Sequence, residues 1–167
     1  VVADHTVAPP APKRGAAVAV MQGASFDARA LRVSDNQDEG VLLTLGAKGS
    51  LHGALIDATA PVGDRELSGT GMRVESGAQL QADSLRISNS RSSALLVHGD
   101  GTHIDVNGLL ADHTAAAPGE KLAGGCLYVE SGAEMKVRQA RLTNCYRVAA
   151  EVSDSATLRA TDLIVDH

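Results

Sequence analysis

The stretch Val74-Glu75-Ser76-Gly77-Ala78 decides the fold, because it recurs further along the chain as Val129-Glu130-Ser131-Gly132-Ala133. The apolar residues on either side of the two copies recur at the same offsets, and a weaker copy lies upstream within residues 18–33. Internal repetition at a fixed spacing is typical of proteins that stack similar units. The sequence therefore predicts a repeat protein, a solenoid, with one continuous core.

A second marker sets the length of the repeat. Asp4, Asp57, Asp112 and Asp166 follow one another at nearly equal spacings, as the units of a tandem repeat do. These spacings divide a single domain, 1–167, into three repeats, 4–56, 57–111 and 112–165. Each repeat contains two turns of a shorter pattern of about 23 residues. Because the chain starts and ends at nearly the same phase, we expect it to be a segment of a longer protein.

Each turn of the shorter pattern contains three very short apolar-x-apolar segments. In the first turn these are Val18/Val20, Phe26/Ala28 and Leu31/Val33, with expected corners near Gly23 and Ala30. Alternation with a period of two indicates strands, and no segment shows a helical stripe. An antiparallel sandwich would need hairpins and longer strands. The pattern therefore predicts an all-β, single-stranded parallel β-helix of about six coils, with three short strands in each coil.

The composition excludes several classes of partner. The net charge of −5 argues against nucleic acid and anionic membrane surfaces, which attract basic proteins. No apolar run approaches the roughly 18 residues of a membrane span, so we expect no direct membrane insertion. Aromatic residues make up only 2% of the chain, with no Trp, so the core must be aliphatic. Nothing in the sequence indicates a cofactor.

The phrase Gly-Cys-Leu-Tyr-Val-Glu-Ser-Gly-Ala at 125–133, with the later Thr143-Asn144 and the terminal Asp-His, resembles the right-handed β-helix repeats of the pectin-lyase-like superfamily. It is similar in style to long repeats in large secreted or surface proteins of bacteria such as myxobacteria, and to autotransporter passenger domains. The resemblance covers nearly the whole chain. It implies right-handed coiling and an extracellular or cell-surface setting, and it carries no catalytic residue onto this sequence.

The two cysteines lie within one turn of the pattern. Cys126 just precedes its first apolar triplet, and Cys145 just follows its last one. A disulfide across this corner would suit an oxidising compartment. Two buried thiols acting as small apolar groups would fit the same positions. The sequence leaves both possibilities open.

Three Pro-containing inserts fall at one phase of the repeat, so we expect them to project from one edge as a ridge. Inserts on one face of a solenoid often form its binding face. The alternative is that they are solvated loops that protect the sheet edge. The candidate binding residues are the charged tips Lys13, Arg14, Asp64, Arg65, Glu66, Glu120 and Lys121.

Polar residues recur at the corner after the third predicted strand: Asp35, Asn89, His113, Asn144 and His167. Stacked polar side chains would form a ladder that satisfies neighbouring donors and acceptors. A metal site at Asp112 and His113, or in the loop from His98 to Asp105, would use suitable ligand types. The spacing alone supports neither metal site, so we predict no metal.

The acidic residues that the pattern points outward are scattered: Glu75, Asp83, Glu130, Glu134, Asp154 and Asp162. No two of these form a pair on adjacent coils, as hydrolysis by paired carboxylates would require. We therefore expect a non-catalytic structural or adhesive segment of a large extracellular bacterial surface protein. Its expected partners are surface glycans or neighbouring β-helix segments. The alternatives are a polysaccharide lyase or hydrolase, and a unit that assembles by end-to-end stacking.

Overall fold

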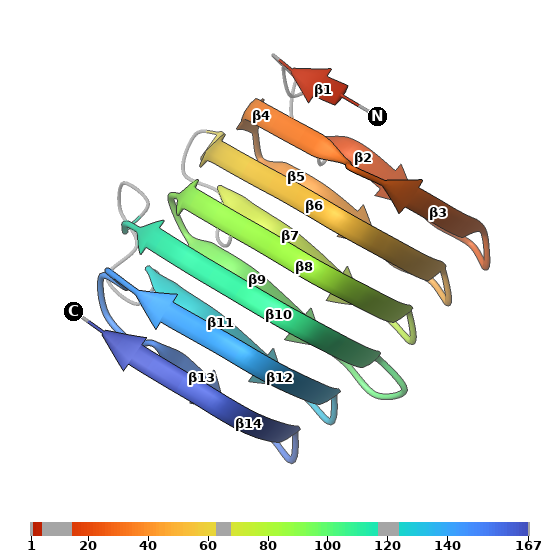
Figure 1. The fold of residues 1–167 in the computed structure, drawn as a ribbon. Helices are drawn as coiled ribbons and strands as arrows, with labels where there is room; N and C mark the ends of the chain where they lie inside the picture. The colour runs from red at the N-terminus through yellow and green to blue at the C-terminus, as the bar shows by residue number, and fades with distance from the viewer. Residues whose placement is uncertain (1, 5–14, 63–67, 117–123, 167) are drawn as a thin grey trace.

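In the computed structural model the chain folds into two parallel β-sheets stacked face to face, with the long strands of one in front of the short strands of the other (Figure 1). The structure describes residues 2–4, 15–62, 68–116 and 124–166. Over these ranges every regular element is a strand. The chain is therefore all-β, as its period-two alternation predicts.

Sheet A holds the longer strands. Most of them run for 10 to 13 residues, which is long for a globular protein. Its strands lie in the order β1-β4-β6-β8-β10-β12-β14, and β3 also pairs with β6. The bounds are β1 Val2–Asp4, β3 Ser25–Arg29, β4 Arg32–Gln37, β6 Lys48–Ala60, β8 Gln79–Ser90, β10 His103–Thr114, β12 Glu134–Thr143 and β14 Thr157–Asp166.

Sheet B holds six shorter strands, in the order β13-β11-β9-β7-β5-β2. The chain alternates between the sheets, and we call a sheet B strand together with the sheet A strand that follows it a level. Six levels run from β2 with β3 and β4 to β13 with β14 (Figure 1). The bounds are β2 Ala16–Val20, β5 Glu39–Leu43, β7 Thr70–Glu75, β9 Ser93–His98, β11 Gly125–Glu130 and β13 Ala150–Val152.

The prediction of a right-handed single-stranded parallel β-helix, with three short strands in each of six coils, is wrong. The structure has two stacked parallel sheets, and a typical level contributes one long strand and one short one. The number of residues that separates a residue from its partner on the next strand also varies. Fewer residues separate Val18 from its partner Val41 than separate Leu43 from its partner Val74, because the second interval contains an insert.

One backbone conformation explains the error. Each long strand contains a residue with positive φ near its middle, such as Gly53 (φ 70°) in β6 and Ser84 (φ 57°) in β8. The pairing continues on both sides of this residue, from His52 with Asp83 to Ala54 with Leu85. A single left-handed residue thus bends the strand without ending it. The sequence pattern mistakes this bend for a corner between two separate strands.

The repeated Val-Glu-Ser-Gly-Ala stretch forms a tight turn that carries the chain from sheet B to sheet A. In the first copy Ser76 and Gly77 both have positive φ, 56° and 76°, and Ala78 N donates to Glu75 O at 3.2 Å. Two successive positive φ values define a type I′ turn, which favours Gly at its second central position. The second copy repeats this geometry at Ser131 and Gly132. The repeat therefore encodes the connection between the sheets.

The core lies between the sheets and is almost wholly aliphatic. Its largest fully buried side chains include Leu43, Ile56, Leu80, Ile87 and Leu127. These side chains stack in columns because the same position of every strand faces inward at every level. The sequence therefore fills its core without Trp and with a single, partly buried Phe.

Near the start of the sheet B strands the two sheets come close together. A Cβ added to Gly40 would lie 2.6 Å from Ile56 Cγ2 of sheet A, and one added to Gly71 would lie 2.7 Å from Ser90 Oγ of sheet A. Such distances are too short for real side chains, so this inward column accepts only small residues. It continues as Ala94 and Cys126 in β9 and β11.

The outer faces of the two sheets differ. The middle strands of sheet B are buried on both faces, and β5, β7 and β9 each carry five successive buried residues. In sheet A buried and exposed residues alternate along the first half of β8 and β12. Sheet A therefore presents its outer face to solvent.

Candidate binding face

The outer face of sheet A carries a shallow hollow of about 240 Å³. Its wall comes from four successive strands, β6, β8, β10 and β12. The lining residues are Ser50, His52, Gln81, Ala82, Asp83, Asp105, Asn107 and Arg138. Apart from the buried Ala82, their side chains point outward because they occupy alternate positions of strands whose other positions face the core. The hollow therefore collects polar groups from four levels.

Two pairs of oppositely charged or chargeable groups lie in the hollow. His52 Nδ1 lies 3.2 Å from Asp83 Oδ2, and Arg138 Nη2 donates to Asp105 Oδ1 at 3.0 Å. Ser50 Oγ lies 3.2 Å from His52 Nε2. Each pair joins side chains of neighbouring strands, so both carboxylates are held in place.

The two carboxylates stand diagonally to each other on adjacent strands. Asp83 is paired with Asn107, and Asp105 with Gln81. The sequence pattern placed Asp83 outward but missed Asp105, because an extra residue in the preceding turn obscured the phase of β10. Aligning Ile104 and Val106 with Leu80 and Ala82 would have found it. The expectation that the scattered outward acids form no pair did not include Asp105, which the structure places diagonally from Asp83 on the neighbouring strand.

The hollow offers chemistry suited to hydroxyl-rich ligands. Carboxylate, amide and guanidinium groups can together accept from and donate to sugar hydroxyls. Asp83 is 57% exposed and Arg138 56% exposed, so both can reach a ligand. No aromatic residue lines the hollow. Binding here would therefore depend on hydrogen bonds and charge.

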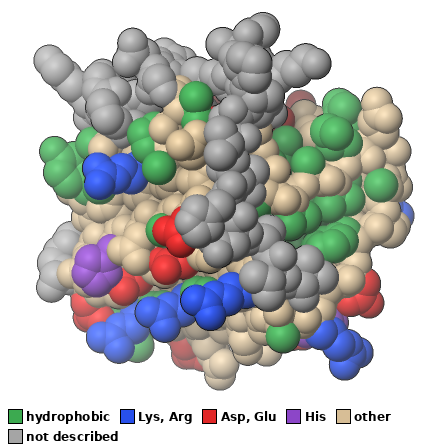
Figure 2. Space-filling view, turned by 90° about the horizontal axis from the view of Figure 1, so that it is seen from above, with side chains coloured by type: hydrophobic (Ala, Val, Ile, Leu, Met, Phe, Trp, Pro, Cys, Tyr) green, Lys and Arg blue, Asp and Glu red, His purple; other side chains and the backbone are tan. Residues whose placement is uncertain are grey.

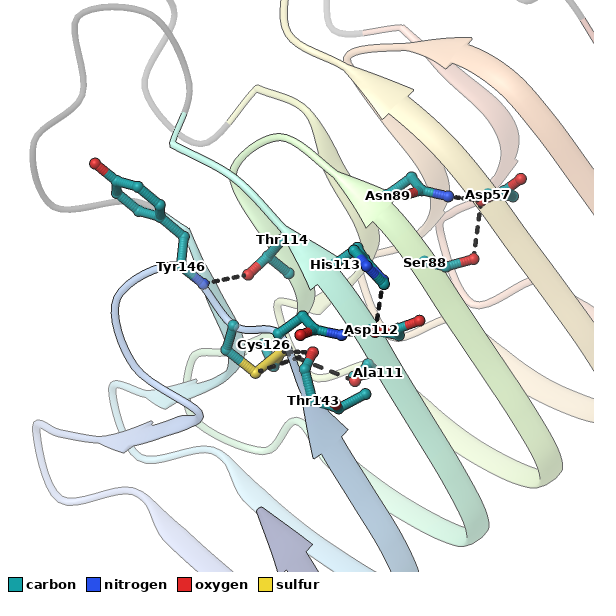
Figure 3. Close-up of polar contacts among 12 residues, drawn as sticks. Asp57, Ser88, Asn89, Ala111, Asp112, His113, Thr114, Cys126, Thr143 and Tyr146 are labelled. Atoms are coloured by element: carbon teal, nitrogen blue, oxygen red, sulfur yellow. Dashed lines mark hydrogen bonds and ion pairs between the residues drawn. A yellow bond between two sulfur atoms is a disulfide. The ribbon is translucent and has the colours of Figure 1, made fainter. Parts of the chain in front are cut away.

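At the far end of the same strands the predicted polar corner is a set of hydrogen bonds between levels (Figure 3). Asp57 accepts from Ser88 Oγ and from Asn89 Nδ2, both at 2.8 Å. Asn89 has a φ of 55°, a conformation that Asn tolerates better than most residues. The predicted residues thus bind the Asp of the neighbouring strand, and the arrangement is structural.

The same arrangement recurs two levels later. Asp112 accepts from Asn144 Nδ2 at 3.0 Å, and His113 Nδ1 lies 2.7 Å from Asp112 Oδ1 (Figure 3). Burial is the largest single influence on the Asp112 carboxyl and raises its pKa. The hydrogen bonds from Asn144 and His113 and the positive charges of His113 and Arg86 outweigh burial, so the pKa falls below 3.8. Asp35 has the same backbone conformation in the first level, and His167 lies outside the described residues.

A disulfide joins Cys126 to Cys145 beside this corner, with their Cα atoms 5.4 Å apart. Cys126 occupies the small inward column of sheet B, and Cys145 follows the end of β12. The Cys126 sulfur lies 3.9 Å from the Ala111 and Thr143 carbonyl oxygens (Figure 3). These are packing contacts, because a disulfide sulfur has no proton to donate. The bond therefore ties the two sheets together at the fifth level.

Sheet B carries a buried ion pair on its outer face. Arg73 Nη1 lies 3.2 Å from Glu39 Oε1 and 3.8 Å from Glu75 Oε2, and the Arg73 and Glu39 side chains are almost fully buried. A buried charge is tolerated only when it is paired in this way. Because both partners are enclosed, this cluster is part of the packed structure and cannot meet a large ligand.

Two further groups on sheet B have shifted pKa values. Burial raises the pKa of Glu130 above 4.5, the nearby His98 opposes this shift, and the negative charges of Glu151 and Asp154 add to it. Burial also raises the pKa of the Tyr128 hydroxyl above 10.0. Glu130 lies in the second copy of the repeated stretch. Burial and the neighbouring charges explain its raised pKa, so the shift does not require a catalytic role.

Other residues considered from the sequence fall elsewhere. Within the described ranges, no group of three His, Cys, Asp or Glu residues could hold a metal ion. The loop from His98 to His103 is a glycine-rich turn, in which Thr102 Oγ1 accepts from Gly77 N at 3.0 Å and so joins two levels. All seven residues of the predicted insert ridge, Lys13, Arg14, Asp64, Arg65, Glu66, Glu120 and Lys121, lie outside the described residues.

Comparisons with protein-family models, with curated proteins and with solved structures find no match to this chain. The resemblance to pectin-lyase-like repeats of bacterial surface proteins thus remains a prediction from the sequence. A search of the described residues for a helix long and apolar enough to cross a membrane finds none.

Proposed function

We propose that this chain is a non-catalytic adhesive module that binds polysaccharide on the outer face of sheet A. The observation that carries this proposal is the hollow formed by β6, β8, β10 and β12, into which two carboxylates, an arginine, a histidine and two amides converge. Convergent polar groups on a rigid scaffold are typical of ligand sites. Sugar hydroxyls are the partners that such a mixture of donors and acceptors satisfies best.

The parallel pairing of the strands supports this proposal, because it fixes the binding groups before a ligand arrives. His52, Asp83 and Asn107 occupy one column of paired residues, and Gln81 and Asp105 occupy the next. Ion pairs between neighbouring strands hold the charged side chains further. A preorganised site loses less conformational entropy on binding, which favours affinity.

The disulfide between Cys126 and Cys145 supports an extracellular or cell-surface location. Disulfides form and persist in oxidising compartments and are rare in the cytosol. A stack of parallel strands with an aliphatic core would also serve as a stiff support for an adhesive face. The structural and the adhesive roles are therefore compatible in one module.

The test is a glycan array screened with and without Ca²⁺, followed by analysis of the products of each hit. The informative variant combines Asp105→Ala with Arg138→Ala, which removes an ion pair from the hollow and leaves the net charge unchanged. The matched control combines Arg147→Ala with Glu151→Ala, an ion pair outside the hollow with Nη1 and Oε2 at 3.3 Å. We expect glycan binding without cleavage that the first variant loses and the second keeps. Equal binding by both variants would place the binding site elsewhere.

One observation favours a second candidate, a polysaccharide hydrolase. Asp83 and Asp105 share the hollow, and paired carboxylates are the usual catalytic groups of glycosidases. This candidate predicts that a bound glycan is cleaved and that Asp83→Asn and Asp105→Asn each abolish new reducing ends. Cleavage that both variants abolish would replace the adhesive role with the enzymatic one.

A further inference from the structure

A second feature of the outer face of sheet A lies beyond the bend in its strands. One outward column of paired residues alternates between arginine and an aliphatic residue at every level. Its members are Arg32, Leu55, Arg86, Leu110, Arg141 and Ile164. Lys and Arg side chains form a row along the sheet A side of the molecule when it is seen from above (Figure 2).

The alternation sets a fixed distance between like groups. Neighbouring strands lie about 4.8 Å apart, so successive arginines of the column are about 9.6 Å apart. Arg32 and Arg86 are exposed, whereas Leu55 and Leu110 between them are only partly exposed. The column thus repeats a cation and an apolar contact with a spacing of two levels.

We propose that this arginine column binds a linear polysaccharide with one carboxylate in each disaccharide, lying along the stack of levels. This inference rests on the proposed function and names the class of glycan. A guanidinium binds a carboxylate through two parallel hydrogen bonds. The aliphatic residues between the arginines would contact the apolar face of the intervening sugar ring. The spacing of two levels is close to the length of an extended disaccharide, so each arginine would meet one acid group.

Acidic residues stand beside the column, and the charge of Arg86 reaches Asp112, whose pKa it helps to lower. Asp57 and Asp112 stand in a neighbouring column, where groups of the protein bind both of them. Asp166 binds Arg141, with Oδ2 at 2.8 Å from both Nε and Nη2. Arg32 and Arg86 form no ion pair with the described residues. They are therefore the arginines best able to bind an acidic glycan.

The experiment compares an alternating uronate polysaccharide with the same polymer after its carboxyl groups are reduced to alcohols. The variants are Arg86→Leu alone and Arg86→Leu combined with Leu110→Arg. The combined variant keeps composition and net charge but breaks the two-level spacing. Arg91→Leu, off the column in the loop after β8, is the charge-matched control for the single variant. Thermal unfolding of each variant checks that it is folded. If the combined variant does not fold, the binding of the single variant Arg86→Leu decides the result.

We expect the acidic polymer to bind the parent chain, and to bind both Arg86 variants with about tenfold lower affinity. A tenfold loss of affinity is the effect expected when one charge-assisted hydrogen-bonded contact is removed. The Arg91→Leu control should bind it as the parent does, and the reduced polymer should bind weakly to all four proteins. Equal affinity of the combined variant and the parent, or equal binding of the two polymers, would overturn the inference while the proposed function stands. Absence of binding to both polymers and to every glycan of the array would overturn both.

Discussion

The Asp112 carboxylate of β10 accepts a 3.0 Å hydrogen bond from the Asn144 amide, which follows β12, one level further along the stack. Asp57 and Asn89 form the same contact two levels earlier at 2.8 Å. Each contact bridges two strands at the point where the chain leaves sheet A. These bridges therefore hold successive levels in register at the edge where the inserts emerge.

Asp112→Ala should lower the free energy of unfolding by about 1 kcal/mol at neutral pH, because it removes a hydrogen bond to a charged group. The pKa of Asp112 is lowered in the folded state, so its contribution is present above pH 3.8 and is lost as the pH falls through the lower folded pKa. Urea unfolding of both proteins at neutral and strongly acidic pH tests this. The exposed Asp83→Ala is the control, and a difference that persists in acid would contradict the prediction.

Glu130→Gln should stabilise the protein at neutral pH. The pKa of Glu130 is raised by burial, so folding favours its protonated form, and stability falls as the pH rises from 4.5 through the folded pKa. The neutral amide of Gln avoids this loss. Thermal unfolding over a series of pH values should show that the variant loses less stability than the parent as the pH rises above 4.5. Glu134→Gln, at a position where the side chain is 64% exposed, is the control for the loss of a carboxylate from an exposed site.

Replacing both Cys126 and Cys145 by Ala should lower the free energy of unfolding by about 3 kcal/mol. The disulfide closes a loop with a sequence separation of 19, and closing a loop of this length lowers the conformational entropy of the unfolded chain by about that free energy. Ala suits the Cys126 site, because Ala94 already occupies the neighbouring place in the same column. Guanidinium unfolding with and without a reductant tests this prediction. The reductant should destabilise the parent and leave the variant unchanged.

Gly71→Ala should destabilise the fold by about 1 to 3 kcal/mol, the usual effect of overpacking a core. The new methyl group would lie 2.7 Å from Ser90 Oγ and 2.8 Å from the backbone oxygen of Ala94. Ala94→Ser, one level further along the same column, should be milder because its backbone already carries a Cβ. A Gly71→Ala protein with the melting temperature of the parent would show that the sheets can separate here without loss.

The sequence could predict the repeat, the all-β composition and the turn near Gly23, because these features are local and recur. It could not predict that residues such as Ser84 bend a strand instead of ending it. Both outcomes require a positive φ, and only the pairing with neighbouring strands tells them apart. The hollow was missed for a related reason. Asp105 meets Asp83 only when the register of β10 is known, and the glycine-rich turn before β10 conceals that register.

The alternation of Asp57, Ser88, Asp112 and Thr143 along one column limits how this chain can change in length during evolution. A tandem duplication of one aspartate-bearing level would set two aspartates side by side on neighbouring strands, where like charges repel, and a duplication of one hydroxyl-bearing level would break the alternation by setting two hydroxyl residues side by side. A duplication of two levels would keep every aspartate beside a hydroxyl or amide donor. We therefore expect longer and shorter versions of this architecture to differ by even numbers of levels.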